Sequence, residues 1–149
     1  MNPEFVERLT SLKNVAYVKE STGDMTRVTE LIRRCGERLG VFCGCDTLAL
    51  ESFAAGAIGW VGGVVNVVPA AHVELFTAAV LQGDYPQARN VFYQMLPMLE
   101  LMEGGGKYTQ FVKAGCRVMG HDVGPPRAPL SAAVETEVVA LRTVLGPWL

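Results

Sequence analysis

The chain has 149 residues, with 13 lysines and arginines against 15 aspartates and glutamates, and a formal net charge of −2. Hydrophobic residues make up 50% and charged residues 19%, which excludes a disordered chain and predicts one domain with a sizeable core. The near-neutral charge gives no reason to expect nucleic acid or an anionic membrane as a partner, and no apolar run reaches the ~18 residues that span a bilayer. The segment from Met1 to Glu7 lacks the features of a signal peptide, so we expect a cytoplasmic protein.

The first half of the chain alternates helical patterns with short apolar runs. Apolar residues at helical spacing predict a helix over Pro3 to Leu12. Three runs predict strands: Val15 to Val18, Val41 to Cys43, and Ile58 to Val61 continuing into Val64-Val65. Unbroken apolar runs are typical of strands that helices cover on both faces, so the pattern predicts a parallel βαβαβ unit with right-handed crossovers.

Two helices connect these runs. Asp24 is the expected N-cap of a helix through Ile32, which Gly36 or Gly40 ends. Asp46 is the expected cap of a helix from Thr47 to Ala55, which Gly56 ends.

After Pro69 the pattern predicts helices only. The first begins at Pro69 and runs to about Leu81, and Gly83-Asp84 breaks it. Four further features complete the chain: a long helix kinked at Pro97, a flexible Gly104-Gly105-Gly106-Lys107 linker, a helix from Tyr108 to about Met119, and a last helix that Ser131 caps and that ends at Leu145. The Met95-Met98-Met102 stripe has the spacing of a helix–helix contact.

The four cysteines, Cys35, Cys43, Cys45 and Cys116, form no Cys-x-x-Cys pair. We interpret them as small buried residues in a reducing compartment, with a metal or redox role as the minor alternative. The histidines, His72 and His121, are interpreted as surface or hydrogen-bonded residues rather than metal ligands.

Lys19 stands at the carboxyl end of the first predicted strand, the end where parallel α/β folds bind ligands. A lysine held partly out of water keeps more of its amine neutral, and a neutral amine can attack a carbonyl to form a Schiff base. From position alone, a lysine that simply emerges into solvent is the commoner case. Nearby, Glu20 and Asp24 are acid/base candidates, although a hydrogen-bonded strand end and a helix cap are the simpler roles.

Four segments carry a family resemblance. Val18-Lys19-Glu20-Ser21-Thr22-Gly23-Asp24 resembles the Schiff-base lysine segment of the dihydrodipicolinate synthase / N-acetylneuraminate lyase family. Cys43-Gly44-Cys45-Asp46, followed by Thr47 to Leu50, is similar to that family's next strand end. Gly56 to Pro69 resembles its last barrel strand with the Asn-x-x-Pro entry to a helix, and Lys107 to Leu130 resembles its C-terminal helical segment.

The resemblance implies an α/β fold, namely strands six to eight of a (β/α)8 barrel followed by C-terminal helices. Residues 1-69 would form the half-barrel portion with its leading helix, and residues 70-149 the last barrel helix and the C-terminal helices, as one structural unit. Lys19 would form the imine with pyruvate or a related 2-oxo acid, beside Gly44 and the backbone of Val61. Cys45 stands where an acidic residue is often found, which leaves the second substrate open.

A complete barrel needs ~250 residues, so five strands have no counterpart here. In the family, the proton-shuttling tyrosine and the hydroxyl pair that binds the substrate carboxylate lie on those five strands, so neither can be assigned to this chain. Tyr17, two positions before Lys19, is more simply a core residue than a replacement for that tyrosine. An open half-barrel leaves backbone groups unpaired at its edges, so we expect a homo-oligomer or a missing N-terminal half as the partner. A fragment of a longer protein fits the sequence equally well.

The function that the resemblance implies is a Schiff-base-forming lyase of the aldolase or synthase type, which needs no metal or organic cofactor. The alternative is a truncated, non-catalytic half-barrel that acts as an assembly or binding module. A third interpretation, a flavodoxin-like domain, needs a nucleotide loop, for which Ser21-Thr22-Gly23 is the only candidate.

Overall fold

The computed structural model describes all 149 residues and has a small parallel sheet at its centre. The strands, in spatial order, are β1 (Tyr17–Glu20), β2 (Gly40–Cys43) and β3 (Gly59–Trp60). Both pairings are parallel, with Lys19 opposite Phe42 and Phe42 opposite Gly59. The βαβαβ prediction is therefore confirmed.

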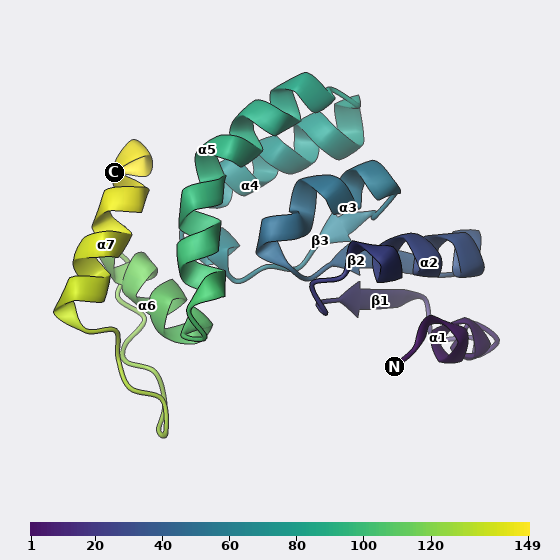
Figure 1. Cartoon of the computed structure of the whole chain (residues 1–149), viewed down its shortest axis with the longest axis horizontal. Coiled ribbons are helices and arrows are strands. Elements are labelled where there is room, and N and C mark those ends of the chain that lie inside the picture. The colour runs from purple at the N-terminus through teal and green to yellow at the C-terminus, as the bar shows by residue number, and fades with distance from the viewer.

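Seven α-helices surround or extend this sheet. They are α1 (Pro3–Leu9), α2 (Met25–Cys35), α3 (Ala49–Ala55), α4 (Pro69–Phe76), α5 (Tyr85–Gly104), α6 (Tyr108–Val118) and α7 (Glu135–Leu145). The chain begins beside the sheet and ends at the opposite end of the molecule, where α6 and α7 pack together (Figure 1). α4 and α5 lie side by side between these two ends (Figure 1).

The strands are shorter than predicted and are covered on one face only. β1 starts two residues later than expected and includes Lys19, and β3 stops at Trp60 because Val64–Asn66 forms a 3-10 turn instead of continuing the strand. Helices cover one face, where Val41 and Cys43 are buried. On the other face Tyr17 is 67% exposed, so the prediction of a sheet covered on both faces, with Tyr17 in a core, is wrong for this chain.

Several predicted helix ends are confirmed. The Asp24 carboxylate accepts a hydrogen bond from the Thr26 backbone N–H at 2.9 Å at the start of α2. Gly56 ends α3 with a φ of +106°, a left-handed conformation that favours glycine. The predicted break at Gly83-Asp84 lies between the π-helical turn that ends at Gln82 and the start of α5, and Gly105 follows the last residue of α5, as predicted.

Two predicted caps are wrong. Asp46 does not cap α3, because its side chain is buried in contacts to other parts of the chain and a 3-10 turn, Asp46–Leu48, precedes the helix. Ser131 does not cap α7, which begins later, at Glu135. The backbone N–H of Val134, the residue before α7, donates instead to the Glu137 carboxylate at 2.9 Å.

The two long helices deviate from regular geometry where the sequence indicates. α4 continues through a π-helical turn, Thr77–Gln82, so the predicted span to about Leu81 is nearly right. α5 contains Pro97 in its interior, and its axis changes direction part-way along its length (Figure 1).

The hydrophobic core has two parts. The larger cluster holds 24 buried residues and lies mainly between α3 and the C-terminal helices, with the Met95, Met98 and Met102 side chains fully buried in it. The smaller one holds six buried residues, among them Val28 and Leu31 of α2 and Val41 of β2. The larger cluster joins residues from both predicted parts of the chain, 1-69 and 70-149, and attaches the helices firmly to the end of the sheet.

Candidate active site at the strand ends

Backbone hydrogen bonds tie the carboxyl ends of the three strands together. The Gly44 N–H donates to the Glu20 carbonyl at 2.8 Å, and the Val61 N–H donates to the Cys43 carbonyl at 2.8 Å. Each bond reaches across to the residue that ends the neighbouring strand. Lys19, Gly44 and Val61, the three residues predicted for the site, therefore lie along one edge of the sheet.

The Lys19 side chain lies directly over Gly44. A β-carbon at Gly44 would stand 2.5 Å from Lys19 Cε and 1.9 Å from Ser21 Oγ, so no side chain other than hydrogen fits there while Lys19 keeps its course. Lys19 itself is exposed on the open face of the sheet, which corrects the expectation of a partly desolvated amine. Only a further layer on this face would take the amine out of water.

Glu20 and Asp24 have the structural roles that were the simpler alternatives. Glu20 is buried, accepts from the Thr22 N–H at 2.6 Å, and forms an ion pair with Arg27 at 3.2 Å. Burial alone would raise the pKa of Glu20, but the hydrogen bonds from Thr22 and the Arg27 guanidinium lower it below its ordinary value. These bonds fix the turn that follows Lys19.

Asp46 joins the sheet edge to the C-terminal helices. Its carboxylate is 1% exposed and accepts from Trp60 Nε1 at 2.8 Å and from the Tyr108 hydroxyl. The Tyr108 oxygen in turn accepts from the Gly63 N–H. The Asp46 carboxylate thereby connects the segment that follows β2 to Trp60, the last residue of β3, and to Tyr108, the first residue of α6.

Glu103, near the end of α5, takes the capping role that the sequence assigns to Asp46. Its carboxylate accepts from the Asp46 N–H at 3.0 Å, the Thr47 N–H at 2.9 Å and the Thr47 hydroxyl at 2.7 Å. Glu103 thus satisfies backbone donors at the start of the turn that leads into α3. The glycine-rich linker lies between two anchored residues, Glu103 and Tyr108.

Burial shifts the pKa values of Asp46 and Cys45. It raises the pKa of Asp46, and the nearby Glu103 carboxylate adds to this rise, although the hydrogen bonds from Tyr108 and Trp60 lower it. Burial also raises the pKa of the Cys45 thiol to about 11, with a hydrogen bond to Glu103 contributing. Cys45 is therefore a neutral thiol at pH 7 and a poor nucleophile.

Sequence reasoning missed Glu103, Tyr108 and Trp60 as members of this network. Glu103 and Tyr108 lie 57 and 62 residues from Asp46 along the chain, and no local sequence pattern indicates a contact over that separation. The one available signal was Trp60, since a tryptophan in an apolar run needs a partner for its indole N–H when it is buried.

His72 is neither exposed nor fully hydrogen-bonded, which corrects the sequence interpretation. Its ring is 6% exposed and stacks on Trp60 with centroids 4.3 Å apart. Nδ1 lies 2.8 Å from the Val68 carbonyl, whereas Nε2 is the one buried side-chain nitrogen or oxygen in the chain without a hydrogen-bond partner. Burial lowers the pKa of His72 to about 4.

This pKa predicts an acid-sensitive fold. Between pH 6.5 and 4 the unfolded chain binds a proton at His72 that the folded chain does not, so stability is full above pH 6.5 and falls as the pH drops towards 4, by up to ~3 kcal/mol. Urea denaturation of the wild type and of His72→Phe at several pH values tests this. The wild type should lose more stability than His72→Phe between pH 6.5 and 4. Asp46, which contacts Trp60 beside His72, is present in both proteins, so its titration does not account for the difference. Parallel curves for the two proteins would contradict it.

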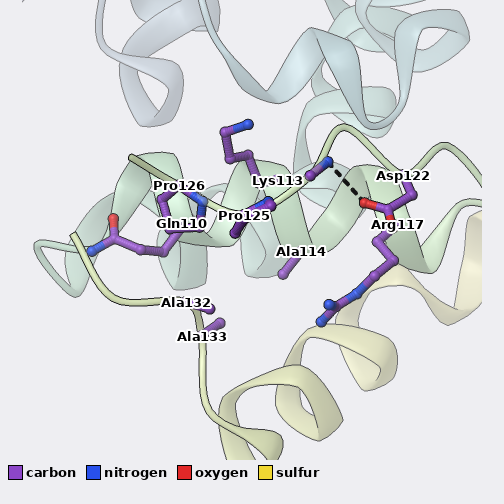
Figure 2. Close-up of a pocket in the computed structure, with 10 residues that line it drawn as sticks. Gln110, Lys113, Ala114, Arg117, Asp122, Pro125, Pro126, Ala132 and Ala133 are labelled. Atoms are coloured by element: carbon purple, nitrogen blue, oxygen red, sulfur yellow. Dashed lines mark hydrogen bonds between the residues drawn. The ribbon is translucent and has the colours of Figure 1, made fainter. Parts of the chain in front are cut away.

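A hollow of about 120 Å³ lies between α6 and the loop before α7, away from the strand ends (Figure 2). Its two cations, Lys113 and Arg117, point away from one another, and Asp122 accepts from the Gly124 N–H at 2.8 Å (Figure 2). These side chains do not converge on a common point, so we assign no ligand to this hollow.

The structure holds no group of three or more histidine, cysteine, aspartate or glutamate side chains arranged to bind a metal ion. The four cysteines are free thiols, three of them buried and Cys45 half-buried. No helix has both the length and the apolar character needed to cross a membrane.

Comparison with known proteins relates this chain to one protein family. The Dihydrodipicolinate synthetase family matches residues 1–146. The chain belongs to this family. Within it, the 4-hydroxy-tetrahydrodipicolinate synthase of Methanothrix thermoacetophila is 33% identical over 97% of this chain and 49% of its own length. The enzyme of the same name from Idiomarina loihiensis is 34% identical over 97% of this chain and 48% of its own length.

The solved family structures agree with the fold. The crystal structure of dihydrodipicolinate synthase from Aquifex aeolicus superposes with a TM-score of 0.91 and 31% identity, covering 99% of this chain and 50% of that one. The chain thus spans about half the length of the family members that it matches. The open face of the sheet and its two free edges are consistent with that half length.

Proposed function

We propose that this chain carries the imine-forming part of a Schiff-base lyase of the aldolase or synthase type, acting on pyruvate or a related 2-oxo acid. β1, β2 and β3 correspond to strands six, seven and eight of a (β/α)8 barrel. The observation that carries the proposal is the position of Lys19, at the carboxyl end of β1 and over Gly44, on the edge it shares with Val61. This is the edge at which parallel α/β proteins bind their ligands.

The chemistry follows from the amine. The neutral Lys19 nitrogen attacks the ketone carbon of the 2-oxo acid, and the resulting carbinolamine loses water to give an iminium ion. The iminium nitrogen accepts the electron pair released when the adjacent carbon loses a proton, which gives an enamine that can attack a second carbonyl compound. Hydrolysis then releases the product and restores the amine. This series of reaction steps requires no metal or organic cofactor.

The surroundings of Lys19 support this role. Gly44 leaves space for the amine beside the backbone, and the Glu20 and Asp46 networks hold the adjoining turns in place. Cys45 offers a neutral, half-buried thiol next to Gly44, so the second substrate meets a less polar surface than an acidic residue would give. The carboxylate-binding and proton-relay groups belong to the half that the chain lacks, so turnover requires that half or an equivalent partner.

The exposure of Lys19 and the open sheet face favour one second candidate, a non-catalytic half-barrel that acts as an assembly module. The two candidates differ in whether Lys19 reacts within a closed barrel. A single-chain chimera, in which residues 1–146 replace the matched half of the Aquifex aeolicus enzyme, provides that barrel.

The chimera is incubated with pyruvate, reduced with borohydride and weighed by mass spectrometry. We expect one reduced adduct per chain, lost in Lys19→Arg and retained in Lys13→Arg, a matched change at an exposed lysine. Circular dichroism verifies that each chimera is folded. A folded chimera without an adduct would favour the assembly module and reject the lyase.

A further inference from the structure

Glu103 binds the backbone of the turn that follows β2. It is the next-to-last residue of α5, and α5 packs against the 3-10 turn after β2. Its carboxylate accepts from the Asp46 N–H at 3.0 Å and the Thr47 N–H at 2.9 Å, and from the Thr47 hydroxyl at 2.7 Å. No other side chain accepts from a backbone N–H between Gly44 and Leu48. The two amides begin the 3-10 turn, where no carbonyl of that turn can accept them.

The position of Glu103 is unfavourable for its own helix. The backbone dipole of a helix places partial negative charge at its carboxyl end, so a carboxylate in the last turn is destabilising there. No lysine or arginine offsets it in the last turn of α5. Burial raises the pKa of Glu103, but hydrogen bonds from Thr47, Cys45 and Asp46 lower it below its ordinary value, so the group is charged at pH 7. The stabilising contacts of Glu103 are therefore those with the strand end and not those within α5.

The turn that Glu103 holds continues directly from Gly44, against which the Lys19 side chain lies. A β-carbon at Gly44 would stand 2.8 Å from Lys19 Cγ and 2.5 Å from Lys19 Cε, so the lysine stem follows the Gly44 backbone closely. The hydrogen bond from the Gly44 N–H to the Glu20 carbonyl fixes one side of Gly44, and Glu103 fixes the chain two and three residues further on. A shift of this turn moves Gly44, and with it the surface that places the Lys19 amine.

We propose that Glu103 is a positioning residue for imine formation. Its carboxylate holds the turn after β2 in place, and this turn keeps Gly44 against the stem of Lys19, so the amine keeps one position relative to the bound 2-oxo acid. The inference rests on the proposed function for the role of Lys19. It adds a residue from the C-terminal helices, outside the strands of the barrel, to those that determine the rate of the reaction.

The rate of pyruvate capture in the chimera tests this role. Each chimera is mixed with pyruvate over a range of concentrations, the imine is trapped with borohydride at successive times, and mass spectrometry gives the rate constant. In Glu103→Gln, an amide group that can only donate replaces one acceptor oxygen and faces the backbone donors. We expect the rate constant at saturating pyruvate to fall about tenfold, since a displacement of about 1 Å already costs ~100-fold.

The concentration of pyruvate that gives half of the maximal rate should stay within about twofold of the unmodified value. The groups that bind the pyruvate carboxylate lie in the other half of the barrel, so initial binding does not depend on Glu103. A rise in this concentration with an unchanged saturating rate would contradict a positioning role.

Two variants and one measurement on the chain itself make the result specific. Glu103→Asp keeps both acceptor oxygens on a stem one carbon shorter, so its rate should lie between those of the unmodified chimera and Glu103→Gln. Glu100→Gln makes the same change at an exposed glutamate of α5 and should leave the rate unchanged. In the 149-residue chain, the Asp46 and Thr47 amides should exchange hydrogen about tenfold faster in Glu103→Gln than in the wild type.

Circular dichroism verifies the fold of each variant. If Glu103→Gln does not fold, Thr47→Val, which removes only the hydroxyl donor, takes its place and should slow capture about threefold. Faster amide exchange with unchanged capture would show a purely structural role and overturn the proposal, as would unchanged amide exchange in Glu103→Gln. An unmodified chimera that forms no imine would reject the proposed function and this inference with it. Equal capture by the unmodified chimera and Glu103→Gln would reject the positioning role alone.

Discussion

Asp46→Ala is expected to lower the free energy of unfolding by about 3–5 kcal/mol. The substitution removes a fully buried carboxylate and leaves two partly buried donors, Trp60 Nε1 and the Tyr108 hydroxyl, without their acceptor. It also opens a cavity where the sheet edge meets α6. Urea denaturation at pH 7 measures the loss, with transitions followed by circular dichroism and fluorescence.

Two variants serve as controls for this prediction. Asp46→Asn keeps an oxygen for Trp60 and an amide that can donate to the Tyr108 oxygen, so its loss should be clearly smaller. Asp122→Ala, in the exposed loop before α7, should change stability by less than about 1 kcal/mol. A loss below about 1 kcal/mol for Asp46→Ala would mean that the network does not hold the C-terminal helices to the sheet.

Gly44→Val is expected to abolish adduct formation at Lys19 while leaving the fold intact. Its β-carbon would lie 2.5 Å from Lys19 Cε and 1.9 Å from Ser21 Oγ, so both side chains must move away from the strand edge. Because the clashing atoms belong to side chains at the open face, the backbone can stay in place, and circular dichroism should show a folded protein. In the chimera, the yield of reduced pyruvate adduct should fall at least ~100-fold, since displacement of a reacting group by about 1 Å already costs that much.

Gly104→Val is the matched control, because a β-carbon at Gly104 meets no atom within 4 Å. Its adduct yield should equal that of the unmodified chimera. Full adduct formation in Gly44→Val would show that the course of Lys19 over Gly44 is not needed for the reaction.

The elements of this fold were predictable where local physics determines them. The apolar runs predicted the three strands and their parallel order, and Asp24 and Gly56 marked the helix ends because capping depends on residues a few positions apart. Strand limits were less accurate, since β3 pairs over only two residues and its neighbours turn away to meet α6. The burial of both sheet faces was predicted from the unbroken apolar runs and is wrong for this chain, because its helices cover one face only.

The site divides in the same way. Lys19 could be placed at the carboxyl end of a strand from the apolar run before it, and the family resemblance implied that Gly44 and Val61 lie beside it. The structure places all three along one edge of the sheet. The supporting network could not be predicted, since Glu103 caps a turn 57 residues away and no local pattern records such a contact. His72 shows the same limit. Its burial against Trp60 depends on how α4 packs beside β3, which the sequence around it does not specify.

The most direct test of the account is the identity of the amine that captures pyruvate. The chain has four lysines, Lys13, Lys19, Lys107 and Lys113, and one of them lies at the carboxyl end of a strand. After borohydride reduction of the chimera with pyruvate, proteolysis and tandem mass spectrometry locate the modified residue. We predict that the adduct lies on Lys19 alone among these four. An adduct on another of the four, or a folded chimera with none on Lys19, would contradict the proposed function.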